Sequence, residues 1–301
     1  MKSIVTADVI RTVKVEGSVE LTDEQLKLLQ SRLYDMVGDF VEAARQSNTK
    51  LYLGGGSVLG AYRHGGIIPW DDDVDLMVTR DEFDKFLETF TKLYSDKYWI
   101  HVPGKTPGYN LLFPQFRLKG TSVRNRDDVA NDECGIPMDM FIIENTYDNP
   151  VRRFFHGLGS LYYGFAVSSR KFYRDWDKLK PFIDKSGSRS LKIMSGLKRA
   201  FGRLLSFKDL DYWVSKADNC HSSCYNTQSK FITVPTGRKH FYGETYRRSD
   251  YLADRQIDFG KYRLYCPGNI EEYLTRMYGD FKKIPDEDKR EHHIYLEPFK
   301  I

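Results

Sequence analysis

Apolar residues recur every three or four positions along two early segments of the chain. The recurrence over residues 22–46 predicts an amphipathic helix, and Thr22 with Gln25 fits a capping box at its start. The same spacing over residues 81–94 predicts a second helix, for which Thr79 is the candidate cap. Each helix would turn one apolar stripe toward a core and a charged face toward water.

Strand-like segments lie between and after these helices. They are short, rich in β-branched and aromatic residues, and several of them alternate apolar with polar positions. A chain that mixes helices and strands in this way is expected to adopt an α+β fold. Strands are predicted over residues 51–53, 73–78, 111–118 and 136–143, with further β-like segments between residues 230 and 266.

The chain changes character after Pro150. The residues from there to about 219 are basic, aromatic and helix-prone. A last helix is predicted over residues 269–278, with Asn269 as its cap. The final twenty residues contain two prolines and are predicted to be irregular.

The composition limits the class of protein. The 301 residues are 41% hydrophobic and 14% aromatic, which is enough for a packed core and excludes a disordered or fibrous chain. No run approaches the roughly 20 consecutive apolar residues of a membrane helix, and the first residues lack the apolar stretch of a signal peptide. Four cysteines in a chain of this length do not form a disulfide framework. We therefore expect a cytoplasmic protein.

Positive charge is concentrated in one segment. Residues 152–208 hold 14 Lys and Arg against three Asp, a net charge of +11, whereas the whole chain carries +4, so the remainder carries −7. Such a segment suggests an anionic partner. Its aromatic residues could form a helical core under a solvated basic face, or that face could lie on the anionic inner surface of a membrane. No nucleic-acid motif accompanies the charge, so we predict no nucleic-acid partner.

One short region combines the residue types of a metal-dependent phosphate site. A glycine-rich turn at residues 54–57 follows the first predicted strand and lets backbone N–H groups approach phosphate oxygens. Asp73 and Asp75 are two residues apart on the next strand, so their carboxylates share one face and can hold one divalent cation. Asp139, on another strand, is the candidate third carboxylate. The pattern predicts Mg²⁺, or Mn²⁺ in its place.

The stretch GGGSVLGAYRHGGIIPWDDDVDL, residues 54–76, resembles the signature of the LicD family, G(T/S)LLGAxRHxGxIPWDDDxD. Residues 136–141 resemble the family's (W/I)xDIFP segment, and residues 273–293 resemble its C-terminal YL, YGD, P, KR and HH elements. The matches follow the family order and span about residues 25–145 and 260–293. No motif of the family covers the basic segment between them.

The resemblance implies a nucleotidyltransferase-type fold related to fukutin-like enzymes, with a mixed sheet flanked by helices. We expect a catalytic core over residues 1–150 and a basic, aromatic helical insertion over residues 151–225. A C-terminal part, residues 226–301, would complete the core and the active site.

The resemblance also implies a reaction. Such proteins transfer phosphocholine, ribitol phosphate or a similar group from a CDP-linked alcohol to a glycan. The expected activity is a Mg-dependent transfer to a sugar hydroxyl of a cell-surface glycan (lipopolysaccharide, teichoic acid or capsule) or of its lipid-linked precursor. Phosphoryl-type transfer depends mostly on positioning and charge stabilisation. With CDP-choline as donor, CMP would be the leaving group.

The family pattern assigns roles to individual residues. Asp73 and Asp75 would ligate the metal, and Asp139 would either ligate it or take the proton from the acceptor hydroxyl. Departures from the signature, such as Tyr62 in place of a small apolar residue, leave the identity of the donor open, because pocket shape decides it. The residues expected to contact substrate or to support the Asp-rich turn are Gly55, Gly56, Ser57, Arg63, His64, Trp70, His292 and His293.

Three other classes of protein fit parts of the pattern. A nucleotidyltransferase would transfer NMP from an NTP and release pyrophosphate. A DxD glycosyltransferase would consume a nucleotide-sugar. A glycan- or membrane-binding module would bind without turnover. The acidic residues argue against the binding module, and the family signature argues against the other two.

Several of the singled-out residues also have structural explanations. Asp71 and Asp72 fit solvated turn residues, Arg63 fits an arginine paired with an acid of the Asp-rich turn, and Asp139 fits a buried, hydrogen-bonded aspartate. A zinc site is a further alternative, because four residues with ligand chemistry occur at loose spacing: Cys220, His221, Cys224 and Cys266.

Overall fold

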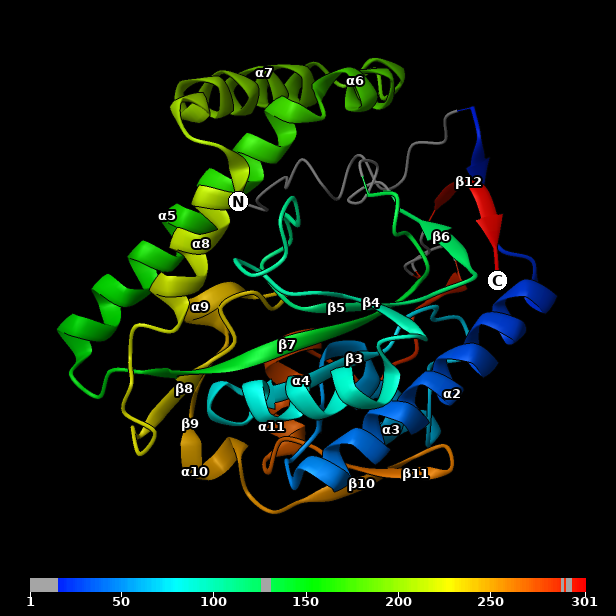
Figure 1. Cartoon of the computed structure of the whole chain (residues 1–301), viewed down its shortest axis with the longest axis vertical. Helices are drawn as coiled ribbons and strands as arrows, with labels where there is room; N and C mark the ends of the chain where they lie inside the picture. Colours follow the sequence, from blue (N-terminus) through cyan, green and yellow to red (C-terminus); the bar gives the residue numbers. More distant parts are fainter. Residues whose placement is uncertain (1–15, 126–130, 288–289, 291–293) are drawn as a thin grey trace.

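The computed structural model describes residues 16–125, 131–287, 290 and 294–301. Its centre is a nine-stranded mixed sheet flanked by helices (Figure 1), which confirms the predicted α+β class. The strands follow the order β10 (Gln256–Phe259), β11 (Tyr262–Tyr265), β2 (Tyr52–Leu53), β3 (Asp75–Thr79), β7 (Ile136–Thr146), β5 (Gln115–Leu118) and β4 (Tyr98–His101), while β8 (Phe231–Thr233) pairs with the end of β7 and with β9 (Thr245–Arg247).

Two of the strand pairs in this sheet are parallel, β3 with β7 and β11 with β2, and the others are antiparallel. Because the two strands run in the same direction, β3 begins beside the early part of β7, and its first residue, Asp75, pairs with Asp139. This part of the sheet carries the polar residues that the sequence singled out.

The start of β3 differs from the prediction. The strand was expected from residue 73, but it begins at Asp75, and Asp73 and Val74 belong to the preceding segment. The Asp71 N–H donates to the Ile68 carbonyl at 2.8 Å, so the chain is still turning just before the strand. Residues 71–74 belong to no strand, so the prediction that Asp73 and Asp75 share one face of a strand is wrong.

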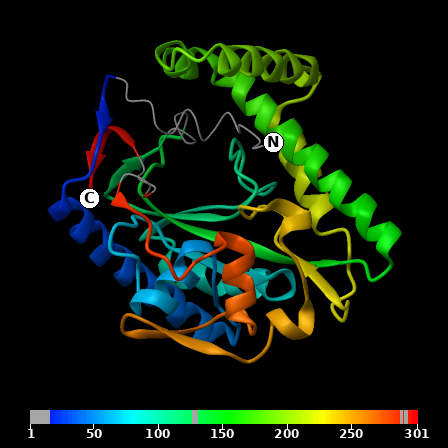
Figure 2. The ribbon, with the colours of Figure 1, turned by 180° about the vertical axis from the view of Figure 1, so that it is seen from behind.

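Helices cover both faces of the sheet. Figure 1 shows α2 (Asp23–Ser47) and α4 (Arg80–Tyr94) on one face, and Figure 2 shows α3 (Gly55–His64) and α11 (Ile270–Tyr278) on the other. The capping box of Thr22 and Gln25 is present at the start of α2. Thr79 occupies the N-cap position of α4, but its hydroxyl donates to Glu82 at 3.2 Å and makes no cap hydrogen bond.

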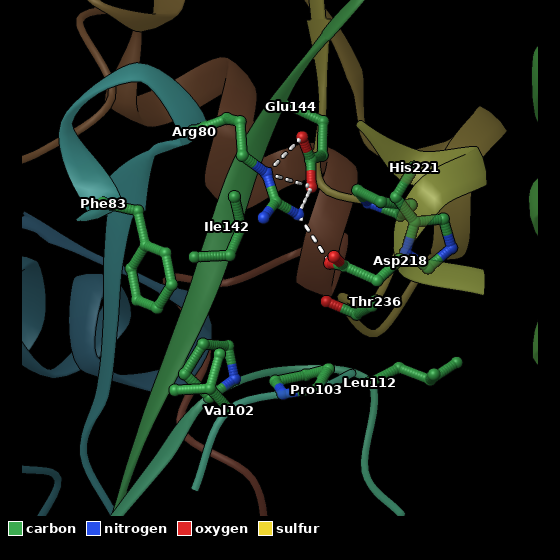
Figure 3. Close-up of a pocket in the computed structure, with 12 residues that line it drawn as sticks. Arg80, Phe83, Val102, Pro103, Leu112, Ile142, Glu144, Asp218, His221 and Thr236 are labelled. Carbon is green, nitrogen blue, oxygen red and sulfur yellow. Dashed lines mark hydrogen bonds and ion pairs between the residues drawn. The ribbon is translucent and has the colours of Figure 1, made fainter. Parts of the chain in front are cut away.

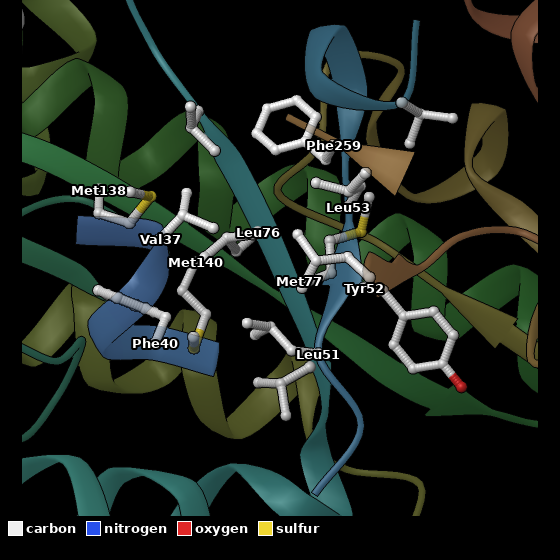
Figure 4. Close-up of a cluster of buried hydrophobic side chains, with 14 of the residues drawn as sticks. Val37, Phe40, Leu51, Tyr52, Leu53, Leu76, Met77, Met138, Met140 and Phe259 are labelled. Carbon is white, nitrogen blue, oxygen red and sulfur yellow. The ribbon is translucent and has the colours of Figure 1, made fainter. Parts of the chain in front are cut away.

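The main core lies between the sheet and the α2 face. Figure 4 shows Val37 and Phe40 of α2 next to Leu76, Met138 and Met140, all of which are buried. Burial alternates along the first half of β7, as expected for side chains that point to opposite faces of a sheet. Each fully buried side chain of this size contributes roughly 1.5–3 kcal/mol. The same alternation turns the polar positions toward the α3 and α11 face.

The basic segment is helical, as its sequence predicts. It contains α5 (Pro150–Arg174), α6 (Trp176–Lys185), α7 (Arg189–Leu204) and α8 (Leu210–His221), and α5 packs against both α7 and α8. In Figure 1, α5 and α8 run together along one side of the sheet, and α6 and α7 lie across the far end of α5. The division of the chain into three parts stays a prediction.

A second, three-stranded sheet corrects the prediction for the end of the chain. β12 (Tyr295–Lys300) lies between β1 (Ser18–Val19) and β6 (Ser122–Arg124), so the last residues are not irregular. The register between β12 and β6 shifts between Leu296 and Lys300, which accommodates Pro298 in the strand. No helix in the described part of the chain is both long enough and apolar enough to span a bilayer.

Candidate active site

Two carboxylates from adjacent strands are neighbours at the start of the parallel pair. Asp75 of β3 and Asp139 of β7 are register partners. Side chains at paired positions of neighbouring strands point to the same face of a sheet. Both aspartates are half-buried, whereas Leu76, Met138 and Met140 beside them are buried toward α2. The structure therefore brings together two of the three predicted carboxylates.

The glycine-rich turn presses against these acids. A Cβ atom at Gly55 would lie 2.6 Å from Asp75 Oδ2, and one at Gly56 would lie 3.1 Å from Asp71 Oδ2. Gly55 also has a φ of +43°, and its N–H donates to the Tyr273 hydroxyl at 2.9 Å. Only glycine allows this approach, which sets the first turn of α3 and its positive dipole end beside the carboxylates.

Ser57 joins the turn to the strand. Its side chain is buried, and its Oγ accepts a hydrogen bond from the Asp75 N–H at 2.9 Å. The Gly54 N–H donates to the Asp75 carbonyl at 2.9 Å, so Asp75 is held at both of its backbone groups. Ser57 thus positions Asp75, and its predicted contact with donor phosphate stays a prediction.

The Asp-rich turn forms a compact group of carboxylates. Ligand oxygens of Asp71, Asp72 and Asp73 all lie within 4.8 Å of one another, and among the described residues these three form the group that could hold a metal ion. Asp72 is only 9% exposed, and the Tyr295 hydroxyl donates to its Oδ2 at 2.8 Å. The interpretation of Asp72 as a solvated turn residue is therefore wrong, because the β12 sheet covers it.

The turn is held in place by α2. Gln30 Nε2 donates to the carbonyls of Ile68 and Asp71, at 3.2 and 2.8 Å. These bonds fix the backbone that presents the carboxylates. Gln30 lies in a helix whose apolar stripe dominates its sequence, and no local pattern marks it as a support for the turn.

Tyr278 connects the Asp-rich turn with Asp75. Burial raises the pKa of its phenol, and the carboxylates of Asp75, Asp71 and Asp73 raise it further. The charges of these three carboxylates therefore all affect the Tyr278 hydroxyl at the end of α11. The Arg238 guanidinium lies 5.7 Å from the centre of the Tyr278 ring. Tyr278 was not among the predicted site residues, although it belongs to the YGD element.

Two successive hydrogen bonds from β5, which we call the polar relay, lead to Asp139. Gln115 of β5 is the antiparallel register partner of Asp139, and its Nε2 donates to Asp139 Oδ1 at 2.6 Å. Arg117 Nε in turn donates to Gln115 Oε1 at 2.7 Å. Arg117 is 1% exposed and also donates to the Gly135 carbonyl at 3.2 Å. The relay fixes the orientation of the Asp139 carboxylate, which is therefore hydrogen-bonded but not fully buried.

Arg63, His64 and Trp70 form a cluster at the end of α3. Arg63 Nε donates to His64 Nε2 at 2.9 Å, and burial together with this guanidinium lowers the pKa of His64. The Trp70 ring is edge-on to His64 at 5.8 Å, and the Arg290 guanidinium lies 4.2 Å from its centre. Arg63 also donates to the Phe281 carbonyl at 3.2 Å. These contacts tie α3 to the C-terminal segment.

Two of the predicted substrate-binding residues, His292 and His293, lie outside the described residues. Their role in closing the site stays a prediction. Tyr295 and Arg290, which flank them, do contact the Asp-rich turn and Trp70.

The structure does not support the alternative of a zinc site at the cysteines. The residues described by the structure contain no metal-binding group that includes Cys220, His221, Cys224 or Cys266. Cys266 is buried in the main core, where its thiol lies 3.7 Å from the Arg255 carbonyl.

A second polar feature lies at the opposite ends of β3 and β7. Figure 3 shows a small pocket in which Arg80 reaches both Glu144 and Asp218, with His221 nearby. Arg80 donates to Glu144 Oε2 at 3.0 Å and to Asp218 at 2.8 Å. Burial alone would lower the pKa of Arg80, but Glu144 and Asp218 raise it above its ordinary value. The group joins the sheet to α8 and contains none of the predicted site residues.

Part of the chain matches a known protein family. Residues 48–104 match the family described as LicD/FKTN/FKRP, nucleotidyltransferase domain. The matched segment contains the glycine-rich turn and the Asp-rich turn and ends before β5 and β7.

Individual relatives match over different lengths. Over 248 residues the chain is 22% identical to the lipopolysaccharide cholinephosphotransferase LicD of Haemophilus influenzae, covering 80% of this chain and 86% of that protein. It is 37% identical over 70 residues to an uncharacterized protein of Rickettsia prowazekii, covering 21% of this chain and 26% of the relative. A Rickettsia typhi protein is 34% identical over 84 residues, covering 25% and 27%.

Proposed function

This chain belongs to the LicD family, and from that premise we propose that it transfers a phosphocholine-like group from a CDP-linked alcohol to a sugar hydroxyl of a cell-surface glycan or its lipid-linked precursor. One observation carries the proposal: Asp75 and Asp139 are register partners beside the glycine-rich turn that begins α3. The similarity to the Haemophilus relative, a lipopolysaccharide cholinephosphotransferase, supports the transferred group and the glycan acceptor.

The glycine-rich turn would bind the donor diphosphate. Gly55 and Gly56 have no side chains to keep a ligand away, and α3 is long enough to have a dipole whose positive end lies at this turn. Backbone N–H groups at a helix start bind phosphate oxygens in many proteins. Ser57 keeps the turn in register with Asp75.

The acids around the turn fit a hard divalent cation. Asp71 and Asp73 belong to the carboxylate group of the Asp-rich turn, and both of them, like Asp75, raise the pKa of the Tyr278 hydroxyl. Mg²⁺ prefers such oxygen ligands and commonly takes only one or two carboxylates plus substrate phosphates. We assign the metal to Asp73 and Asp75, with Asp71 as a further candidate ligand. When bound, the cation would neutralise charge on the diphosphate.

Asp139 would act on the acceptor. Its carboxylate, oriented by Gln115, would accept the proton of the sugar hydroxyl as the hydroxyl oxygen bonds to the phosphorus of the transferred group. The bond from that phosphorus to the bridging oxygen breaks at the same time, and the nucleoside monophosphate leaves with the electron pair. With CDP-choline the products are a phosphocholine-substituted sugar and CMP.

Phosphorus NMR of the products tests this reaction. The protein is incubated with Mg²⁺, a lipid-linked or free oligosaccharide pool, and in turn CDP-choline, CDP-ribitol, CDP-glycerol, CTP or UDP-glucose. Release of CMP with a new phosphodiester on the glycan is the expected result, and the donor that reacts identifies the alcohol. Release of pyrophosphate from CTP would replace the proposal with a nucleotidyltransferase, and release of UDP would replace it with a glycosyltransferase.

A further inference from the structure

Helix α5 exposes its large apolar side chains between residues 154 and 165. His156 on its buried side bonds to the Thr146 hydroxyl at 3.0 Å and to the Cys220 carbonyl at 2.8 Å. The buried residues of the helix are His156, Gly157, Ser160, Ala166, Val167, Ser169 and Phe172. A helix that faces water shows the reverse pattern. The exposed side chains recur at spacings of three and four along one face: Phe154, Phe155, Leu158, Leu161, Tyr162 and Phe165.

Helix α7 continues this surface. Ile193, Leu197 and Leu204 are all more than half exposed, and they share one face of the helix. The Phe165 ring of α5 lies 5.1 Å from the Phe201 ring of α7, so the two apolar stripes meet. We call the joined stripes the α5–α7 face.

Exposed apolar area is concentrated on this face. Of the 18 large hydrophobic residues that are exposed among the described residues, 12 lie between residues 151 and 207. Scattered apolar residues on a surface are ordinary, but a contiguous row of this length marks a contact surface. The interpretation of the segment as a helical core under a solvated face therefore accounts for only its buried half.

Positive charge borders the apolar row. Helix α7 carries Arg189, Lys192, Arg199 and Arg203, all exposed, and contains no acidic residue. On the helix these four positions lie along one side, next to the stripe that contains Leu197. Apolar side chains flanked by Lys and Arg characterise helices that lie in the plane of an anionic membrane surface.

We propose that the α5–α7 face docks on the surface of an anionic lipid bilayer. Its aromatic and aliphatic side chains would enter the boundary between headgroups and acyl chains, and its basic side chains would meet the lipid phosphates. A second copy of the chain is a poorer occupant, because the segment carries +11 and two such faces would repel each other. Docking is peripheral, since no described helix could span the bilayer.

Vesicle flotation tests the proposal without donor or acceptor, so its outcome is independent of the proposed reaction. The full chain is mixed with vesicles of phosphatidylcholine alone or of phosphatidylcholine with phosphatidylglycerol. Binding to the anionic vesicles is expected, with weak binding to the neutral ones and a loss of binding as ionic strength rises.

Matched variants locate the contact. Phe155→Glu with Leu197→Glu, and separately Arg189→Glu with Arg203→Glu, are expected to weaken binding to anionic vesicles by about tenfold or more. The controls are Leu28→Glu, an exposed leucine of α2, and Lys27→Glu with Lys85→Glu, exposed lysines of α2 and α4. Circular dichroism and thermal melting confirm that each variant is folded.

Three results would overturn the proposal. One is equal binding of the control and α5–α7 variants. Another is equal binding to neutral and anionic vesicles at all salt concentrations. The third is a wild-type dimer in light scattering that Leu197→Glu converts to a monomer, with no vesicle binding by either, which would assign the face to a second copy.

Discussion

Asp75 and Asp139 are register partners on adjacent parallel strands, although α4, β4, β5 and β6 lie between them in the chain. The pairing turns both carboxylates to one face of the sheet, where Gly55 at the start of α3 lies against Asp75. The glycine-rich turn, Ser57 and Gln115 each contact one of the two aspartates. The proposed reaction requires both carboxylates at one substrate.

Removing either carboxylate should stop turnover while leaving the fold intact. Asp139→Asn is expected to lower kcat for CMP release by about 10²- to 10⁴-fold, because the variant cannot accept the proton of the acceptor. Asp75→Asn should also abolish the dependence of the rate on Mg²⁺ concentration. The control is Asp258→Asn, an exposed aspartate of β10 in the same sheet. Equal rates for wild type and Asp139→Asn would remove Asp139 from the mechanism.

Gly55→Ala should damage activity more than it damages stability. Gly55 has a φ of +43°, and the new methyl group would meet Asp75 Oδ2. Gly120→Ala is the matched control, because Gly120 has a φ of +82° and nothing within 4 Å of a Cβ. Both variants should lose about 1–2 kcal/mol of unfolding free energy from backbone strain. When kcat/KM is measured for both variants, only that of Gly55→Ala should fall sharply. An equal loss of kcat/KM in the two variants would show that the glycine-rich turn is not part of the active site.

Glu244 should make stability fall as pH rises. Burial raises the pKa of Glu244 from 4.5 to about 7, while a hydrogen bond from the Lys239 N–H acts in the opposite direction. The folded state keeps a proton that the unfolded state releases above pH 4.5, so this stabilisation is complete below that pH and is lost as pH rises through about 7.

Urea unfolding of the wild type and Glu244→Gln at several pH values measures this effect. Glutamine keeps the acceptor oxygen but does not titrate. The stability of the variant relative to wild type should grow by about 3 kcal/mol across that window and stay constant above it. Comparing the two proteins cancels the contributions of His101 and His221, whose pKa values burial lowers to about 4 and about 3. A constant difference at every pH would contradict a raised pKa for Glu244.

Breaking the Arg80 group should be costly. Arg80→Met leaves Glu144 buried without its cation and should lower the free energy of unfolding by about 3–5 kcal/mol. Arg45→Met removes an arginine from an exposed pair with Glu42 and should cost far less, because solvent screens such a pair. Denaturant unfolding measures the loss of unfolding free energy in both variants, from the shift of the midpoint at an unchanged m-value. Similar losses for the two variants would mean that Arg80 contributes no more than a surface ion pair.

Local patterns predicted the elements that carry the site. The spacing of apolar residues located α2, α4 and α11, and the predicted glycine-rich turn lies where α3 begins. The strand predicted over residues 136–143 contains Asp139, which the structure places on the half-buried face of β7. Each of these features depends on interactions within a few residues, which a sequence exposes directly.

The contacts that complete the site depend on distant pairing. Nothing near Gln115 indicates that its amide meets Asp139, because the register of β5 on β7 decides it. Asp72 was taken for a solvated residue because its cover, Tyr295, belongs to a strand paired with β1 and β6. That strand itself escaped prediction because its partners lie far away in the chain and Pro298 interrupts its pattern.

Calorimetric titration with CDP-choline tests the central claim most directly. Wild type, Asp75→Asn and the control Asp258→Asn are each titrated with and without Mg²⁺, and CTP and UDP-glucose serve as competing ligands. We predict that wild type and Asp258→Asn bind CDP-choline more tightly with Mg²⁺, and that Asp75→Asn loses this difference. Binding of CTP or UDP-glucose alone, or an unchanged Mg²⁺ effect in Asp75→Asn, would contradict a CDP-alcohol site built on Asp75.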